Sequence, residues 1–483
     1  MNRTLTFHTF FFIFCLVIMR MSGLISKMVI AKYITPYEYG LITLITISLP
    51  SMFQYITNFC LNDLLSHSKE GRSYFGFAVF YSFITSLIVA LFLFIFHEPF
   101  FKFLNLPLNI WKILFIAFFI AMFPLGILAD TTGLLRGLKK YTLTSVIVSL
   151  PSVIKLLLVI FAIYLFHTTD FITILFIFAS SSLIALIIII IRYYNLFFSF
   201  LNSFNLPSKQ IFFFGTSVFI VSIFGGLNQI ICKVVVSHDL GITLQGYFDV
   251  SLTLMAMLSF SFAAMSFISI PEATGAENKE EIFFKRGELG DVVRCLFSFL
   301  IFCVILLYFY SPSLVNLLFG SEYIRAADYM MILAIGYIFL FMQQFLAYMN
   351  ISFHKAREYK NMIVATLICL SFSPITTHIF IQFMSFMGAY ISLTLSLIIY
   401  TLLTMLSSKD FTPLLALSHK IDRIIISSAV TFLFLYIFSY LSISFIYGMA
   451  SSFLIFASLL FLFGYLDKNL ILGIFKKVEI HDK

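Results

Sequence analysis

Two basic residues lie inside the first long apolar segment of the chain. Residues 10–30 read FFFIFCLVIMRMSGLISKMVI, and this segment contains Arg20 and Lys27. Their spacing places both side chains on one face of a helix, two turns apart. Each cation at the centre of a bilayer costs about 2.5–3.5 kcal/mol on insertion scales. We therefore expect these side chains to face a hydrated cavity, and a cationic cavity within a membrane favours an anionic cargo.

The two cations are not equivalent candidates. Arg20 lies in the middle of its segment, where its side chain cannot reach an interface. Lys27 lies near the outer end, so snorkelling to the interface is an alternative for it. Arg20 is therefore the stronger candidate for the cavity.

The second half of the chain carries a similar basic residue and a nearby acid. Lys233 lies late in an apolar segment, in a position that resembles that of Lys27. It could line the cavity or snorkel outward. Asp249, in GYFDVSLTL, is one of few acids at membrane depth. It could pair with Lys233, or it could carry a proton or a sodium ion.

Further polar residues recur at membrane depth. Gln54 and Asn58 are one helical turn apart in the second apolar segment. Polar stripes in membrane helices either join helices or line a pathway, and we favour pathway lining here. Lys155, in the fifth segment, could face the same cavity or the opposing half, and with Asp249 it is a candidate for ion coupling or pairing. Asp130 and Arg136, near the end of the fourth segment, are expected to form an ion pair.

The composition is that of a polytopic helical membrane protein. Of the 483 residues, 61% are hydrophobic and 11% are charged, whereas soluble domains average about 25% charged residues. A membrane-spanning helix needs about 20 apolar residues. We therefore predict an all-α polytopic membrane protein with about 14 transmembrane helices, or thirteen if the last pair is one helix. The predicted spans are 10–31, 40–64, 74–96, 110–133, 142–165, 171–191, 211–235, 246–270, 293–310, 327–350, 361–382, 385–406, 424–441 and 444–466.

The distribution of basic residues predicts the orientation. With the N-terminus inside, 22 of the 30 Lys and Arg residues fall on the cytoplasmic side, 4 on the other side and 4 inside helices. By the positive-inside rule, both termini are cytoplasmic, and the protein is predicted to lie in the cell (inner) membrane.

A faint internal repeat predicts two pseudo-symmetric lobes of six helices. Glu38-Tyr39-Gly40 in the first half matches Gln245-Gly246-Tyr247 in the second half, each at the start of a helix. Internal repeats with the substrate site at their interface are the usual transporter design. The predicted parts are an N-lobe, an inter-lobe cytoplasmic linker, a C-lobe, and two further helices with a cytoplasmic tail, at 1–191, 192–210, 211–406 and 407–483.

Several classes of function are excluded by what the sequence lacks. No Cys-x-x-Cys or Cys/His cluster indicates a metal site, and no other cofactor is predicted. The basic residues form no dense stripe, which argues against nucleic-acid binding. No GxxxxGK[ST] motif indicates ATP hydrolysis. No loop is large enough to fold as a catalytic domain, so we do not expect an enzyme.

Four stretches resemble those of a known family, in the family's order. They are AKYITPYEYGLITL (31–44), LLRGLKKY (134–141), LVNLLFGSEYIRAADYMMILAIGY (314–337) and GYFDVSLTL followed by Pro271-Glu272. They are similar to the Glu-Tyr-Gly opening of helix two, the Arg-Gly turn after helix four, the Phe-Gly segment before helix ten and the helix-eight region of polysaccharide flippases. The resemblance is to the O-antigen (oligosaccharide-lipid) branch of the multidrug/oligosaccharidyl-lipid/polysaccharide exporter superfamily.

The resemblance implies a fold and a function. It implies two six-helix lobes around a central cavity, and movement of a polyprenyl-pyrophosphate-linked oligosaccharide between leaflets. Family cations in helices one and seven meet the anionic head group, and Arg20, Lys27 and Lys233 match those locations. The implied partners are membrane lipids, a polysaccharide polymerase and glycosyltransferases. Coupling to H⁺ or Na⁺ and to the membrane potential is an accompanying expectation.

Three alternatives remain open from the sequence. A lipid-linked peptidoglycan-precursor flippase would share the fold and an anionic cargo. A multidrug/cation antiporter would prefer buried acids, whereas the intramembrane balance here favours cations. A membrane polysaccharide polymerase or ligase would need a large outer loop for its chemistry, and the longest outward segments are short.

Overall fold

The computed structural model describes most of the chain. The described residues are 3–58, 61, 65, 71–138, 140–201, 205–207, 209–258, 288–352, 356–408, 421–440 and 445–462. Their regular secondary structure is entirely helical, which confirms the predicted all-α class. Residues 259–287 and the C-terminal residues 463–483 are the longest segments outside this range.

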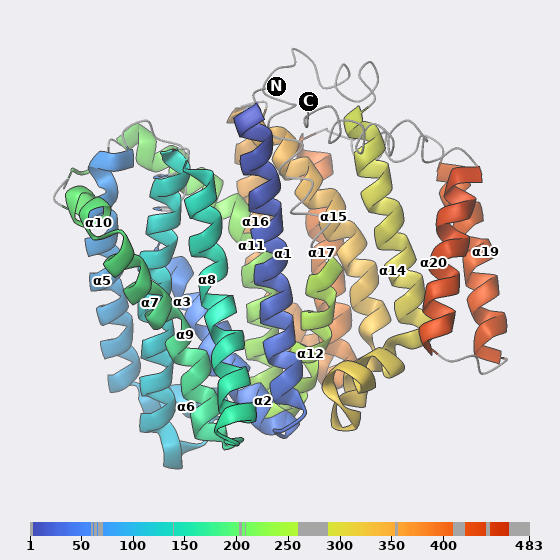
Figure 1. Cartoon of the computed structure of the whole chain (residues 1–483), viewed down its shortest axis with the longest axis horizontal. Coiled ribbons are helices and arrows are strands. Elements are labelled where there is room, and N and C mark those ends of the chain that lie inside the picture. Colours follow the sequence, from blue (N-terminus) through green and yellow to red (C-terminus); the bar gives the residue numbers. More distant parts are fainter. Residues whose placement is uncertain are drawn as a thin grey trace. The chain divides into compact units, whose positions relative to one another are not determined.

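The helices run in sequence through both halves of the chain (Figure 1). The first half contains α1 (Arg3–Ala31), α2 (Pro36–Thr43), η1 (Leu44–Ser48), α3 (Leu49–Thr57), α5 (Gly71–Ile95), α6 (His97–Phe103), η2 (Leu108–Ile110), α7 (Trp111–Gly137), α8 (Tyr141–Ile160), η3 (Phe161–Leu165), α9 (Phe171–Arg192) and α10 (Tyr194–Leu201). The second half contains α11 (Lys209–Leu240), α12 (Ile242–Leu258), α14 (Glu288–Phe319), η5 (Ser321–Ala327), α15 (Met330–Ser352), α16 (Ala356–Met384), α17 (Phe386–Ser408), α19 (Ile421–Tyr440) and α20 (Phe445–Leu462).

Each predicted span contains a described helix, but three of these helices are not among those long and apolar enough to cross a membrane. Ten described helices are long and apolar enough to cross a membrane, and η5 with α15 is a bent eleventh. Each of the fourteen predicted spans contains a helix, but α11 and α12 are not among those eleven and α20 is a shorter apolar helix. The predicted ends of the α12 and α20 spans fall outside the described residues.

The second predicted span is one helical column with a local change of register. Thr35 caps α2 through a capping box with Glu38, and Pro36 opens the helix. The column then passes through the π-helical turn η1 into α3. Pro50 has no backbone N–H, so the carbonyl four residues earlier loses its α-helical donor. The π-turn lies where this interruption falls, and it ends at Ser48.

The chain divides into two compact units. Unit 1 comprises Met1–Thr253, Leu318–Tyr323 and Thr366–Leu393, and unit 2 comprises the remaining residues. In unit 1, α1 packs along α8, and α7 packs against α5, α8 and α9. A buried apolar cluster, including Phe75, Leu135 and Leu186, joins α5, α7 and α9.

Unit 2 contains its own apolar contacts. Helices α19 and α20 pack together, and Leu435 of α19 lies in a cluster with Ile305 and Tyr310 of α14. The predicted lobe boundaries stay a prediction, and α10 lies within the segment predicted as the linker.

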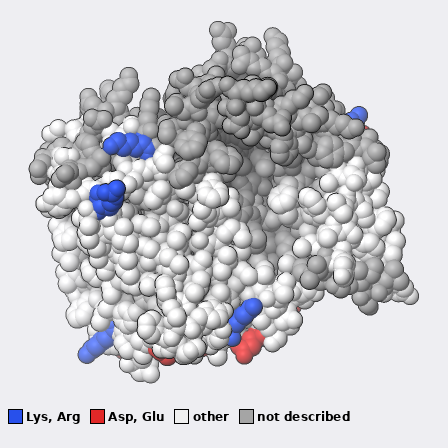
Figure 2. All heavy atoms as spheres, viewed as in Figure 1, with Lys and Arg blue, Asp and Glu red and all other residues white. Residues whose placement is uncertain are grey.

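The surface has the character of a membrane protein. On the face in Figure 2, the blue and red atoms of charged side chains lie near the upper and lower margins of the described surface. The described surface between them is uncharged. Exposed apolar side chains are correspondingly numerous on single helices, as on α5, where Phe80, Leu87, Leu91 and Phe94 are all exposed. Such an uncharged band fits the hydrocarbon core of a bilayer.

Candidate functional site

Three charged side chains from three helices of unit 1 meet at one point. Asp249 of α12 lies between Lys27 of α1 and Lys233 of α11. The Lys27 ammonium donates to Oδ2 of Asp249 at 2.9 Å, and the Lys233 ammonium pairs with the other carboxylate oxygen. We call these three residues the lysine–aspartate cluster.

Neutral groups complete the environment of the carboxylate. The Tyr39 hydroxyl donates to Oδ2 at 3.3 Å, and the Thr253 hydroxyl lies 3.5 Å from the same oxygen. Thr253 follows Asp249 by one helical turn, which places both side chains on one face of α12. Lys27 also donates to Thr253 at 2.8 Å, and Lys233 donates to Ser48 of the π-turn at 3.5 Å.

The cluster is buried and carries a net positive charge. Asp249 is 0% exposed and Lys233 is 8% exposed, and the Lys27 side chain is 14% exposed. Two ammonium groups share one carboxylate, so the cluster sums to one positive charge. In a low-dielectric environment such an excess is costly without an anion.

A third lysine lies in the same region without an acidic partner among the described residues. The Lys155 ammonium of α8 lies 4.9 Å from the centre of the Phe178 ring, a cation–π contact. It is close enough to Lys27 for the two charges to repel each other. Three lysines and one carboxylate therefore lie in this region, which raises the local excess to two positive charges.

Close contact between two helix ends brings this cluster together. A Cβ atom on Gly40 of α2 would lie 2.4 Å from the Ile242 carbonyl oxygen, and one on Gly246 of α12 would lie 2.3 Å from that of Pro36. Only glycine allows backbones to approach so closely. Gly40 lies near the start of the column that carries Ser48 and directly follows Tyr39, so the contact sets Tyr39 beside Asp249. These glycines belong to the two matching tripeptides of the sequence repeat.

The first helix presents its two cations differently. Arg20 is exposed, whereas Lys27 is turned into the cluster. The geometry therefore gives no support to an interfacial, snorkelling Lys27. It makes Lys27, and not Arg20, the better-positioned member of the pair within unit 1.

The polar stripe of the second span lies elsewhere in unit 1. The Gln54 and Asn58 amides donate to backbone carbonyls of α7, at Leu125 (3.4 Å) and Gly126 (3.1 Å). These bonds join α3 to α7, so the geometry is that of helix–helix contact. Their predicted role as pathway-lining residues stays a prediction.

The expected ion pair between Asp130 and Arg136 is absent. Asp130 is fully buried and accepts a hydrogen bond from the Ser82 hydroxyl, whereas Arg136 is exposed near the end of α7. Six residues separate the two along the helix, a spacing that turns their side chains to different faces.

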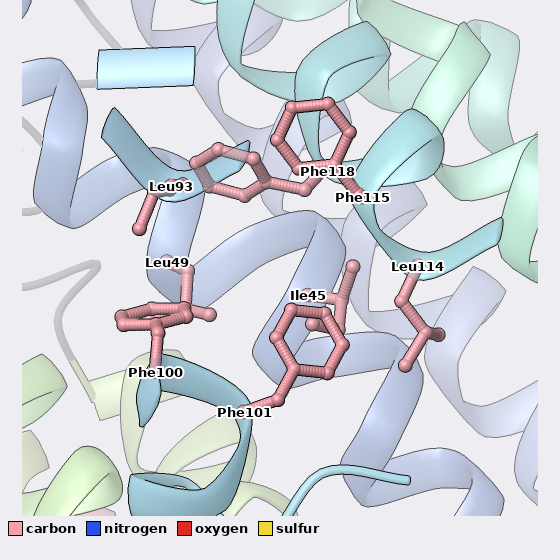
Figure 3. Close-up of a pocket in the computed structure, with 8 residues that line it drawn as sticks. All are labelled: Ile45, Leu49, Leu93, Phe100, Phe101, Leu114, Phe115 and Phe118. Carbon is pink, nitrogen blue, oxygen red and sulfur yellow. The ribbon is translucent and has the colours of Figure 1, made fainter. Parts of the chain in front are cut away.

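A small cavity in unit 1 is unsuited to a charged ligand. Figure 3 shows its lining, which is entirely apolar. The lining residues are Ile45, Leu49, Leu93, Phe100, Phe101, Leu114, Phe115 and Phe118. Such a cavity stays dry and offers no partner to an anion.

Sequence reasoning missed the neutral members of the site. Tyr39, Ser48 and Thr253 carry no charge, and aromatic or hydroxyl residues are common in membrane helices. The signal that could have found Tyr39 is its position in the repeated tripeptide beside Gly40. Among the described residues, no group of three or more His, Cys, Asp or Glu side chains could hold a metal ion.

Comparison with known proteins shows the fold. No protein-family model matches the chain, and no curated protein sequence matches it. Among solved structures, the lipid II flippase MurJ in an inward closed conformation is similar with a TM-score of 0.67 and 14% identity, over 99% of this chain and 100% of that one. A multidrug resistance MATE family transporter of the MOP superfamily has a TM-score of 0.58 and 13% identity, over 83% and 96%.

A third similar structure is that of a MOP superfamily transporter from Pyrococcus furiosus, described as having a binding pocket of reverse polarity. Its TM-score is 0.58 at 12% identity, over 84% of this chain and 94% of that one. The chain therefore has the fold of MOP superfamily transporters, the multidrug/oligosaccharidyl-lipid/polysaccharide exporters, and is a multi-pass membrane protein.

Proposed function

We propose that this protein is a flippase that moves a polyprenyl-pyrophosphate-linked oligosaccharide from the cytoplasmic to the outer leaflet. The repeat unit would be that of O-antigen or another surface polysaccharide. The observation that carries the proposal is the excess of ammonium groups over carboxylates. Lys27, Lys233 and Lys155 lie in one region of unit 1, where Asp249 pairs with Lys27 and Lys233, and Lys155 has no acidic partner among the described residues.

The chemistry of the head group matches this excess. A pyrophosphate cannot cross hydrocarbon unassisted, because its charges would lose their hydration. Ammonium groups offset that loss through charge-assisted hydrogen bonds. A lysine binds phosphate as a point charge, without the bidentate geometry of arginine, so several lysines are needed where one arginine would hold two oxygens. Arg20 and the polar Gln54 and Asn58 are proposed to line the route of the head group.

The direction of transport follows from the membrane potential. An interior-negative potential favours outward movement of an anion by about 2.3 kcal/mol per charge per 100 mV. We propose alternating access by rocking of two lobes, with the lipid tail remaining in the bilayer. Cytoplasmic termini in the cell membrane, and partnership with glycosyltransferases and a polymerase, accompany this proposal.

The charge of the site favours a flippase over a multidrug antiporter. The similar structures include both classes, a lipid II flippase over nearly the whole chain and multidrug transporters over about five sixths of it. An antiporter of cationic drugs would also place acids at the site, and here the described site is cationic. A lipid-linked peptidoglycan-precursor flippase is the second candidate, favoured by the lipid II flippase among the similar structures. A membrane polysaccharide polymerase has no such support.

A reconstituted assay tests the proposal. Proteoliposomes holding the wild-type protein should move a fluorescent polyprenyl-pyrophosphate oligosaccharide between leaflets. Lys27→Met should reduce that rate at least about tenfold, because an unscreened charge-assisted contact is worth about 1.5–3 kcal/mol. Lys102→Met is the matched control, because Lys102 pairs with Glu98 on the exposed helix α6.

The outcomes separate the candidates. Equal rates for wild type and Lys27→Met would contradict the cationic site. Movement of lipid II in preference to the oligosaccharide lipids would select the peptidoglycan candidate. Arg20→Ala in cells should abolish export of the surface polymer while the protein stays inserted in the membrane. Normal surface polymer in that strain would remove Arg20 from the proposed route.

A further inference from the structure

A second carboxyl group lies deep in unit 1, away from any basic partner. Asp130 of α7 is 0% exposed. Its Oδ2 accepts a hydrogen bond from the Ser82 hydroxyl of α5 at 2.8 Å. Its Oδ1 is fully buried and has no hydrogen-bond partner in the described part of the chain. Buried polar atoms in native proteins are almost always paired, so this oxygen requires an explanation.

Gly126, one turn before Asp130 on α7, lies among side chains of α3 and α5. A Cβ on Gly126 would lie 3.8 Å from both the Ser82 hydroxyl and the Thr57 hydroxyl, an ordinary van der Waals contact, so the three helices pack together at this level. The Asn58 amide donates to the Gly126 carbonyl at 3.1 Å and is also a side-chain hydrogen-bond partner of the Asp130 carboxyl group. Ser86, one turn beyond Ser82 on α5, is buried with an unpartnered hydroxyl as well. The spacing of four places Ser86 on the same face of α5 as Ser82, which bonds to Asp130.

No described side chain supplies a positive charge to Asp130. The charged residues on α7 and on the helices packed against it, where side chains are described, are Lys112, Arg136, Lys155 and Arg192. Tyr55, Tyr74 and Tyr81 are titratable groups on the same set of helices. None of these bonds to Asp130, and the Lys155 ammonium lies over the Phe178 ring instead.

The negative charge of a carboxylate in this position must be neutralised by a small ion, because no described basic side chain pairs with it. Burying an isolated carboxylate costs far more than a fold can supply, so the group binds a cation or becomes neutral by binding a proton. Intramembrane acids of this kind are by default functional. We propose that Asp130, together with Ser82 and Ser86, forms a binding site for a monovalent cation, H⁺ or Na⁺.

This site goes beyond the proposed flippase function, because it needs no lipid head group. It also assigns the binding of an ion to Asp130 and not to Asp249. Asp249, for which the sequence left open pairing with Lys233 or carrying an ion, is occupied by two ammonium groups and two hydroxyl contacts. Asp130 has two neutral donors, Ser82 and Asn58, and an unpartnered Oδ1, so it has room for the positive charge of an ion.

Thermal unfolding of the purified protein tests the proposal and separates the two ions. Melting is measured in NaCl, KCl and choline chloride at equal ionic strength, and across a series of pH values. A sodium site makes the melting temperature rise with NaCl and not with the other salts, because a ligand of the folded state stabilises it. A proton site makes the melting temperature fall as pH rises in all three salts, because the folded state then holds a proton that the unfolded state has released.

Asp130→Asn removes the charge and retains the shape. It should abolish whichever response the wild type shows, while Ser181→Ala, which removes a buried hydroxyl bonded within α9, should retain it. Identical salt and pH responses in wild type and Asp130→Asn would overturn the proposal. Should Asp130→Asn fail to purify, Ser82→Ala carries the test. It should shift the half-saturating concentration of the cation about tenfold, the effect of about 1.4 kcal/mol, and an unchanged concentration would overturn the proposal.

Discussion

Two buried carboxyl groups of unit 1 have opposite surroundings. Asp249 meets two ammonium groups, a tyrosine and a threonine, and the surplus of charge around it is positive. Asp130 has a serine hydroxyl and an asparagine amide as neutral donors, and one of its oxygens is unpartnered in the described structure. The same residue type therefore serves two purposes. At Asp249 it holds lysines together, and at Asp130 it leaves a place for a positive charge.

The largest expected effect is the loss of stability when Asp249 is neutralised, compared with the smaller change when Asp130 is neutralised. Asp249→Asn leaves Lys27 and Lys233 buried without their counter-charge, and breaking a buried pair costs about 3–5 kcal/mol. Asp130→Asn should change stability by less than about 1 kcal/mol in conditions where its cation is not bound, because no ion pair is broken. Denaturation of both variants in detergent measures the difference. Equal destabilisation would remove the distinction between the two carboxyl groups.

The next effect concerns the helix contact that builds the lysine–aspartate cluster. A methyl group at Gly40 would clash with the Ile242 carbonyl oxygen, so Gly40→Ala should destabilise the protein by about 1–3 kcal/mol. Gly23→Ala is the control, because a Cβ there meets nothing closer than 4.0 Å. Melting temperatures of the two variants test this, and a Gly40→Ala protein as stable as Gly23→Ala would refute the close contact.

The same substitution sharpens the comparison between the two regions. Separation of α2 from α12 withdraws Tyr39 from Asp249, whereas α3, α5 and α7 around Asp130 are untouched. Gly40→Ala should therefore weaken binding of the anionic head group and leave the response to Na⁺ or pH intact. Loss of both properties together would indicate a general loss of packing.

The smallest expected effect is at Asp170, outside the membrane-spanning segments, and it serves as a reference for the buried carboxyl groups of Asp249 and Asp130. Asp170 caps α9 by accepting the Thr173 N–H at 2.9 Å, and this hydrogen bond lowers the pKa of Asp170. Asp170→Ala should cost about 1 kcal/mol, and Asp170→Asn should cost less because asparagine also caps helices.

The direction of the pKa shift at Asp170 determines how its contribution to stability depends on pH. Because the folded-state pKa is lowered, the contribution of Asp170 is present above the unfolded carboxyl pKa and is lost as pH falls through the folded value. The difference in stability between wild type and Asp170→Ala should therefore shrink in acid. A difference that grows in acid would contradict the cap. This trend is opposite to that expected of a proton site at Asp130.

The sequence predicted the helices and the charged members of the site more readily than their arrangement. Charges at membrane depth are costly, so Lys27, Lys233 and Asp249 stood out individually, and the apolar runs predicted the helices that carry them. Which face of α1 turns inward depends on its packing against α8, and that packing is not encoded in spacing alone. Arg20 and Lys27 share a predicted face, yet Arg20 is exposed and Lys27 is paired.

The neutral partners of Asp249 and the unpartnered oxygen of Asp130 could not be predicted from the sequence, for a different reason. Tyr39 and Ser48 acquire their role from the approach of two glycines at a helix crossing, and a crossing is a property of the folded chain. Asp130 and Arg136 have opposite charges a short distance apart, which suggested a pair. Only the helical geometry shows that Arg136 points elsewhere and that Ser82 is the partner.

Direct binding of the head group tests the central claim, that the lysine–aspartate cluster receives an anion. The dissociation constant of a polyprenyl pyrophosphate is measured for the purified wild type, Lys27→Met, Lys233→Met and Asp130→Asn in matched detergent. Each lysine variant should bind at least about tenfold more weakly, a loss of about 1.4 kcal/mol or more, and Asp130→Asn should bind as the wild type does. Equal affinity in all four proteins, or a loss confined to Asp130→Asn, would contradict the account.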